Sequence, residues 1–233
     1  MTPPPVKLWA QKRSIPILQF GSLSADEAIN ILGANKPDIF IVAAYGKIIP
    51  KAILDIPMHG TLNVHPSLLP KYRGASPVQS TILAGDKTTG VSIMLLDEKM
   101  DHGPIVASEE YDIIDESITA EKLEEDLACV GGELLAQIIP DWIAGKIKTK
   151  DQDHEKATYT KKFTNEDGRI SPEKIGTPEA ERIIQALSQN PGTFSEIIDK
   201  NGKLIRLKLL PGNIVIPAGK KKTSLTEFKK SSL

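Results

Sequence analysis

The chain has 233 residues, of which 40% are hydrophobic and 25% are charged, an ordinary composition for a globular protein. No run approaches the roughly 18 apolar residues of a membrane span. Residues 1–6 lack the charged region followed by an apolar one that marks a signal peptide, and the single cysteine, Cys129, excludes an internal disulfide. These features favour a cytoplasmic protein of one large domain or two modest ones.

The net charge of −1 conceals an asymmetry between the two parts of the chain. Residues 1–145 contain 11 Lys and Arg against 19 Asp and Glu, a net charge of −8. Residues 146–233 contain 18 against 11, a net charge of +7. A basic second part suggests contact with a polyanion, and a solubilising lysine-rich surface is the competing explanation.

In the first part, short apolar runs rich in β-branched residues predict strands, and capping or amphipathic patterns predict helices. The strands are expected at residues 15–18, 38–44, 60–65, 91–96 and 105–114. The helices are expected at residues 24–33, 76–85 and 119–144. Strands that alternate with helices predict an α/β fold with a mostly parallel sheet.

The rest of the chain predicts a linker and a second, smaller module. Residues 147–158 are polar and of mixed charge, which is typical of a linker between a domain at 1–146 and a module at 159–233. A helix is expected at residues 179–187 and an alternating strand at 204–210. We therefore expect a short, mainly β C-terminal module rich in turns.

Two segments carry residues suited to acyl transfer: Asn-Val-His-Pro-Ser-Leu-Leu-Pro from Asn63, and Met-Asp-His-Gly-Pro at residues 100–104. Side chains alternate along a strand, so Asn63 and His65 share one face. Asn63 would donate to a developing oxyanion, and His65 would be the general base. A hydrogen bond donated by His65 to Asp101 would orient the ring and raise its pKa.

Other kinds of chemistry lack their motifs. The remaining histidines, His59, His102 and His154, have no partners at metal-ligand spacing, so we expect no metal. The sequence has no glycine-rich phosphate loop and no Gly-x-Ser-x-Gly elbow. These observations disfavour nucleotide-binding and serine-hydrolase readings.

The motif residues resemble a known family. Asn63-Val-His65, Ser67-Leu-Leu-Pro70, the Arg-Gly-Ala at residues 73–75 and Met-Asp-x-Gly at 100–103 resemble the formyltransferases that use 10-formyltetrahydrofolate. The Thr-Pro-Pro-Pro-Val-Lys at residues 2–7, together with residues 42–50, resembles the methionyl-tRNA formyltransferases in particular. The resemblance is dense over residues 2–145 and weaker through residues 157–168.

This resemblance implies transfer of a formyl group from 10-formyltetrahydrofolate to the amine of methionyl-initiator-tRNA, by a monomer that needs no metal. It implies a catalytic set of Asn63, His65 and Asp101, and a folate site lined by Ser67, Leu68, Leu69 and Pro70. It also implies a Rossmann-like formyltransferase sheet that here lacks its first strand, because the family begins with a strand, a glycine turn and a helix before the Thr-Pro-Pro-Pro segment. Lys99 and His102 depart from the residues that the family often has beside Asp101.

Several alternatives remain open from the sequence. Another formyltransferase of the same superfamily, acting on glycinamide ribonucleotide or a sugar amine, or a formyltetrahydrofolate hydrolase, would carry the same motif. A non-catalytic remnant that binds folate or tRNA is a second alternative, and it belongs to a different functional class. A general RNA-binding protein is a third, and it depends only on the lysines near the C-terminus.

Overall fold

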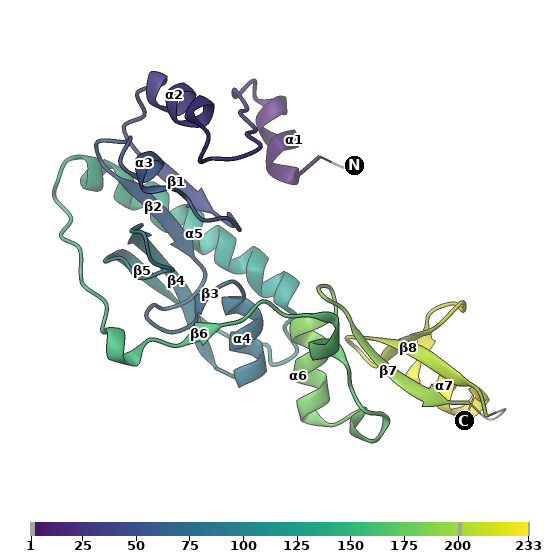
Figure 1. The fold of residues 1–233 in the computed structure, drawn as a ribbon. Coiled ribbons are helices and arrows are strands. Elements are labelled where there is room, and N and C mark those ends of the chain that lie inside the picture. The colour runs from purple at the N-terminus through teal and green to yellow at the C-terminus, as the bar shows by residue number, and fades with distance from the viewer. Residues whose placement is uncertain (1–2, 200–201, 233) are drawn as a thin grey trace.

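The computed structural model describes residues 3–199 and 202–232, and its two four-stranded sheets are bridged by helices (Figure 1). The first sheet lies in the N-terminal part of the chain and the second near the C-terminus. The helices α4 (Pro77–Ala84), α5 (Ala120–Ile143) and α6 (Pro178–Leu187) contact one another between the two sheets. Over the described residues, no helix combines the length and the apolar character needed to cross a bilayer.

The first sheet has the strand order β1-β2-β4-β5. Its strands are β1 (Phe40–Ala43), β2 (Thr61–His65), β4 (Thr88–Leu95) and β5 (Ile105–Asp112). The α/β class is confirmed, and β1 and β2 are parallel as expected. Strands β4 and β5, however, join antiparallel. Residues 96–104, which join β4 to β5, are too few for the crossover of a dozen or more residues that a parallel pair requires. Strand β4 is also antiparallel to β2, although the connection between these two strands contains a helix.

Helix α5 covers one face of this sheet, and Gly131 allows the helix to approach strand β2 closely. Thr119 caps the helix by accepting a hydrogen bond from the amide of Lys122, so the helix predicted at residues 119–144 is confirmed. A Cβ on Gly131 would lie 2.7 Å from Val64 of β2. Val64 therefore faces the helix, and by strand alternation Asn63 and His65 face the opposite side.

Helix α4 follows β2 at the position that the sequence predicts. Ser76 precedes its first residue, Pro77, and Gly85 ends it with a φ of 70°. Glycine adopts this left-handed conformation without the steric cost that a Cβ imposes. The hydroxyl of Ser76 makes no capping hydrogen bond, so proline at the first position and glycine after the last define this helix.

Two predictions in the N-terminal segment are wrong. Residues 15–18 form no strand, and Ile15 and Leu18 are about half exposed. A strand needs a hydrogen-bonding neighbour, and no described strand lies against this segment. The capping box at residues 24–27 is also not formed, because α2 (Asp26–Ala34) begins one residue after Ala25, which makes no side-chain capping bond.

The remaining N-terminal helices are short. They are α1 (Pro5–Lys12) and α3 (Lys51–Leu54). Strand β1 is at the edge of the sheet and is only half buried, because its burial alternates residue by residue. The run at residues 38–44 is therefore a strand, as expected, but an edge strand instead of a buried one.

The C-terminal module is built on a four-stranded antiparallel sheet, as expected for a small, mainly β module. The strand order is β10-β9-β8-β7, with β7 (Thr193–Ile198), β8 (Leu204–Leu210), β9 (Ile214–Pro217) and β10 (Thr223–Ser224). Helix α6 and the C-terminal helix α7 (Leu225–Ser232) pack against it. Its core contains Ile184 of α6, Leu207 of β8 and Phe228 of α7.

The segment between the two parts is extended and attached to the first part. It contains the 3-10 turn η1 (His154–Lys156) and strand β6 (Tyr159–Thr160), and the 3-10 turns η2 (Asn165–Gly168) and η3 (Pro172–Lys174) follow. Strand β6 pairs in parallel with β3 (Arg73–Gly74). The predicted linker is therefore fixed along the loop that follows His65, while the domain boundaries themselves stay a prediction.

Candidate functional site

His65 ends strand β2 and is buried, with both ring nitrogens facing polar groups. Its Nε2 lies 3.0 Å from the carbonyl oxygen of Tyr72, and its Nδ1 lies 3.7 Å from Oδ1 of Asp101. A carbonyl can only accept a hydrogen bond, so Nε2 carries the proton in the neutral ring. Nδ1 then carries a free lone pair on the side of Asp101, and this lone pair can accept a proton.

Burial controls the pKa of His65. Removal of the ring from water lowers the pKa below its ordinary value, although the Asp101 carboxylate and the Tyr72 carbonyl each act to raise it. The expected upward contribution of Asp101 to the His65 pKa is present, but burial outweighs it and the net direction is downward. A lowered pKa keeps His65 neutral at neutral pH, and a neutral imidazole can act as a general base.

Asp101 is held by its own backbone and by the loop after His65. Its φ is 46°, in the left-handed region, where Asp is found more often than most residues. Its Oδ2 accepts a hydrogen bond of 2.6 Å from the amide of Gly74. Gly74 itself has a φ of 110°, which favours glycine. The other oxygen, Oδ1, remains directed at His65, at a distance just beyond hydrogen-bond length.

Asn63 occupies the same face of β2, two residues before His65. It pairs in register with Met94 of β4 and with Val42 of β1. Two residues along a strand separate side chains by roughly 6.6 Å. Within the described residues, no hydrogen bond engages its side-chain amide, which is partly exposed. The structure thus brings His65 and Asp101 into proximity and leaves Asn63 on the same face with a free donor.

The four residues predicted to line a folate site divide into two pairs. Ser67 is buried and its hydroxyl donates to the carbonyl of Lys71, while the amide of the buried Leu69 donates to Ser92. These two residues shape the loop. Leu68 and Pro70 are partly exposed and have side chains available for contact with a ligand.

The sequence analysis did not predict a buried polar cluster beside Asp101. Arg73 is 1% exposed, and its guanidinium donates to the side chains of Gln152, His154 and Tyr159. Gln152 in turn donates to the backbone of Asp101. No local pattern marks Gln152, because its partners lie about fifty and eighty residues away in the chain.

The described residues around this site do not form a cluster of metal ligands. Among residues 3–199 and 202–232, no group of three or more His, Cys, Asp and Glu side chains is placed to hold an ion. His102 pairs with Asp97 at 2.7 Å and stacks on the ring of His154 at 4.1 Å between centroids. These two histidines therefore pack against the Arg73 cluster.

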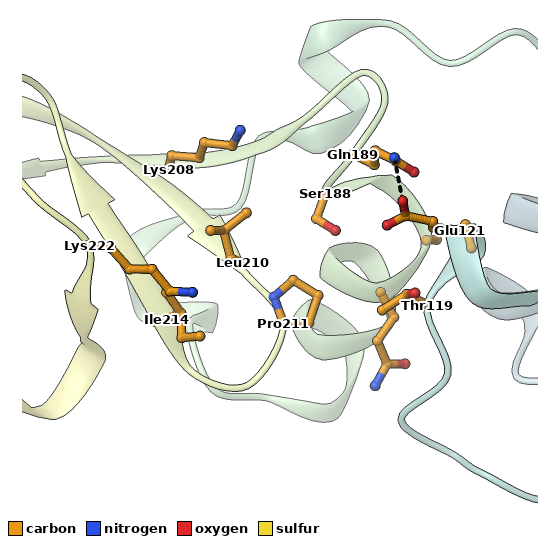
Figure 2. Close-up of a pocket in the computed structure, with 12 residues that line it drawn as sticks. Thr119, Glu121, Ser188, Gln189, Lys208, Leu210, Pro211, Ile214 and Lys222 are labelled. Atoms are coloured by element: carbon orange, nitrogen blue, oxygen red, sulfur yellow. Dashed lines mark hydrogen bonds between the residues drawn. The ribbon is translucent and has the colours of Figure 1, made fainter. Parts of the chain in front are cut away.

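A cavity of about 390 Å³ lies elsewhere, between the start of α5, the end of α6 and strands β8 and β9 (Figure 2). Thr119 and Ser188 line it from the helices, and Lys208 and Lys222 from the C-terminal module. Glu121 accepts a hydrogen bond from Gln189 at its rim. None of the candidate catalytic residues lines this cavity.

The family model described as "Formyl transferase" matches residues 1–139 of this chain. The chain belongs to the formyl transferase family. The methionyl-tRNA formyltransferase of Chloroflexus aurantiacus is 43% identical over 195 residues, which are 84% of this chain and 62% of that protein. The methionyl-tRNA formyltransferase of Bacillus subtilis is 37% identical over 222 residues, covering 92% of this chain and 69% of that protein. The chain thus spans about 62% of the length of the Chloroflexus aurantiacus relative.

Two solved structures share the fold. The methionyl-tRNA formyltransferase from Clostridium thermocellum has a TM-score of 0.63 at 20% identity, over 93% of this chain and 89% of that one. HypX from Aquifex aeolicus, in complex with tetrahydrofolic acid, has a TM-score of 0.66 at 20% identity, over 79% of this chain and 31% of that one. At these identities, the comparison establishes the architecture.

Proposed function

We propose that this chain transfers a formyl group from 10-formyltetrahydrofolate to the amino group of methionyl-initiator-tRNA, for translation initiation. The observation that carries the proposal is the arrangement around His65, whose Nδ1 lone pair faces Asp101 while Nε2 is bound to Tyr72. Identity of 37–46% to methionyl-tRNA formyltransferases supports this choice of substrate. The tetrahydrofolic acid bound to HypX, which shares the fold, supports a folate as the formyl donor.

Each catalytic residue has one role in the proposed reaction. The substrate amine attacks the formyl carbon, and the side-chain amide of Asn63 donates to the oxygen as it gains negative charge. His65 Nδ1 takes the proton that the amine loses, directly or through a water, and Asp101 stabilises the imidazolium that forms. The bond from the formyl carbon to N10 then breaks, and the proton passes from His65 to N10. Formyl-methionyl-tRNA and tetrahydrofolate are the products.

The residues present fit a folate donor on this face. Asn63 offers an amide with no partner among the described side chains, and Leu68 and Pro70 are partly exposed apolar residues of the loop that follows His65. Ser67 and Leu69 fix the loop from beneath. We therefore assign Leu68 and Pro70 to direct contact with the folate, and Ser67 and Leu69 to the shape of its site.

The C-terminal module supplies a surface suited to tRNA. Lys208, Lys220, Lys221 and Lys222 are exposed, and no ion pair with a described carboxylate neutralises them. Unpaired lysines attract phosphates, and the counterions released on contact favour binding. This surface favours tRNA over a small amine as the formyl acceptor, and the protein acts as a cytoplasmic monomer in this proposal.

The test is formylation of methionyl-initiator-tRNA by the purified 233-residue chain with 10-formyltetrahydrofolate. His65→Ala is the inactive control, and a sugar amine and water replace the tRNA in parallel reactions. Transfer to the tRNA that disappears in His65→Ala supports the proposal. Transfer only to the sugar amine, or hydrolysis alone, would identify a different member of the family. A folded chain that transfers nothing would favour a non-catalytic binding protein.

A further inference from the structure

Arg73 is a buried cation with no carboxylate beside it. It is 1% exposed, and no described Asp or Glu forms an ion pair with it. A buried charge is costly unless hydrogen bonds compensate for the lost water. The compensation comes mainly from Gln152, whose Oε1 accepts from Nε at 3.1 Å and from Nη2 at 2.6 Å. Nη2 also lies 2.8 Å from Nδ1 of His154.

These bonds fix the orientation of the Gln152 amide. Its oxygen must face the guanidinium, because Arg73 only donates hydrogen bonds. The nitrogen of the amide then points away, and it lies 3.0 Å from the carbonyl of Asp101 and 2.7 Å from the carbonyl of Gly103. Gln152, which is 6% exposed, therefore uses both of its acceptor sites and both of its donors.

The two carbonyls belong to the turn that carries Asp101. This backbone has a φ of 46° at Asp101, a conformation that costs on the order of 1 kcal/mol or more unless its surroundings enforce it. The turn is confined on its other side, because a Cβ on Gly103 would lie 1.9 Å from the carbonyl of Leu95. Gln152 thus closes the turn from the side of the linker.

We propose that Gln152 is a positioning residue of the active site, with Arg73 holding its amide in register. Gln152 touches neither His65 nor the reacting atoms, and it acts through the backbone of Asp101. The carboxylate of Asp101 must reach both the amide of Gly74 and the ring of His65, so a shift of its backbone changes both contacts. The linker between the two parts of the chain thereby becomes part of the catalytic apparatus. This inference rests on the proposed function.

The decisive variant is Gln152→Glu, which has the same shape and pairs more strongly with Arg73 but loses both donors. A merely structural role, attaching the linker to Arg73, would survive this change. A positioning role would not, because a carboxylate repels the carbonyls of Asp101 and Gly103. Gln137→Glu on the exposed surface of α5 is the matched control. Gln152→Met removes the donors without adding a charge and is measured beside it.

Two readouts test the proposal. We expect kcat to fall about 10²-fold in both Gln152 variants, the effect of a misplacement of about 1 Å, with KM for the folate nearly unchanged. Independently of any substrate, the amide proton of Gly74 should move upfield in the NMR spectrum as its bond to Asp101 lengthens. Folded Gln152 variants with an unchanged Gly74 resonance and the kcat of the Gln137→Glu control would overturn the inference. An inactive wild-type chain would sink the proposed function instead, while the Gly74 resonance would still decide the positioning role.

Discussion

Nδ1 of His65 and Oδ1 of Asp101 face one another at 3.7 Å, while Nε2 of His65 is hydrogen-bonded to the Tyr72 carbonyl. Tyr72 is in turn held by its amide, which donates to Thr158, and by its hydroxyl, which donates to Asp86. The tautomer of His65 therefore depends on a loop that the linker anchors. Tyr72 therefore orients the ring of His65, and Asp101 stabilises the positive charge that the ring acquires.

Replacement of Asn63 by Ala removes the only proposed side-chain donor to the oxyanion. We expect kcat to fall by about 10²–10³, or about 2.7–4 kcal/mol of barrier, with little change in KM. Steady-state kinetics measure the effect. Asn30→Ala on the exposed face of α2 is the matched control. A rise in KM with an unchanged kcat would show that Asn63 binds substrate without stabilising the transition state.

The pH dependence of activity should report His65. The base must be unprotonated, and burial lowers its pKa below the ordinary 6.5, so the acid limb of kcat/KM should lie below pH 6.5. Asp101→Asn removes a contribution that raises this pKa, and the limb should then move to still lower pH, with a lower rate at every pH. NMR titration of the His65 ring gives the same midpoint without substrate. A limb that moves upward in Asp101→Asn, but not in the exposed control Asp55→Asn, would contradict the assignment.

Adjacent glycines of α5 should respond oppositely to alanine. Gly132→Ala meets no atom within 4 Å, and we expect it to stabilise the chain by up to about 1 kcal/mol through helix propensity. Gly131→Ala would lie 2.7 Å from Val64 and 3.1 Å from Val91, both in the sheet that carries His65. Overpacking of this kind costs about 1–3 kcal/mol. Urea denaturation measures both, and equal effects would show that α5 does not press on β2 at this point.

Exposed lysines of the C-terminal module should affect tRNA affinity and leave the chemistry unchanged. In the double variant Lys208→Gln and Lys222→Gln, we expect KM for methionyl-tRNA to rise and kcat to stay constant. The slope of log KM against log salt should become shallower by about 1–2, because fewer phosphate contacts release counterions. The controls are Lys51→Gln and Lys87→Gln, whose side chains already pair with carboxylates. An equal effect in the controls would indicate a general charge effect.

Much of the fold was predictable because its signals are local. The helix from Thr119 follows from its cap and its apolar spacing, and the helix from Pro77 follows from the proline and glycine that bound it. The run at residues 15–18 has the composition of a strand but no neighbouring strand in the described structure. Whether a β-branched run becomes a strand depends on hydrogen-bond partners that are remote in sequence.

Sequence alone is enough to place Asn63 and His65 on one face, because side-chain alternation is a property of any strand. It also pointed to Asp101 as their companion, through the motif that the family carries. The direction of the His65 pKa, the tautomer that Tyr72 selects and the role of Gln152 follow from the folded structure. The pKa depends on burial, because desolvation acts only after the fold has excluded water. The role of Gln152 depends on a contact about fifty residues away in the chain. Tyr72 lies only seven residues from His65, but its amide is bound to Thr158, 86 residues away.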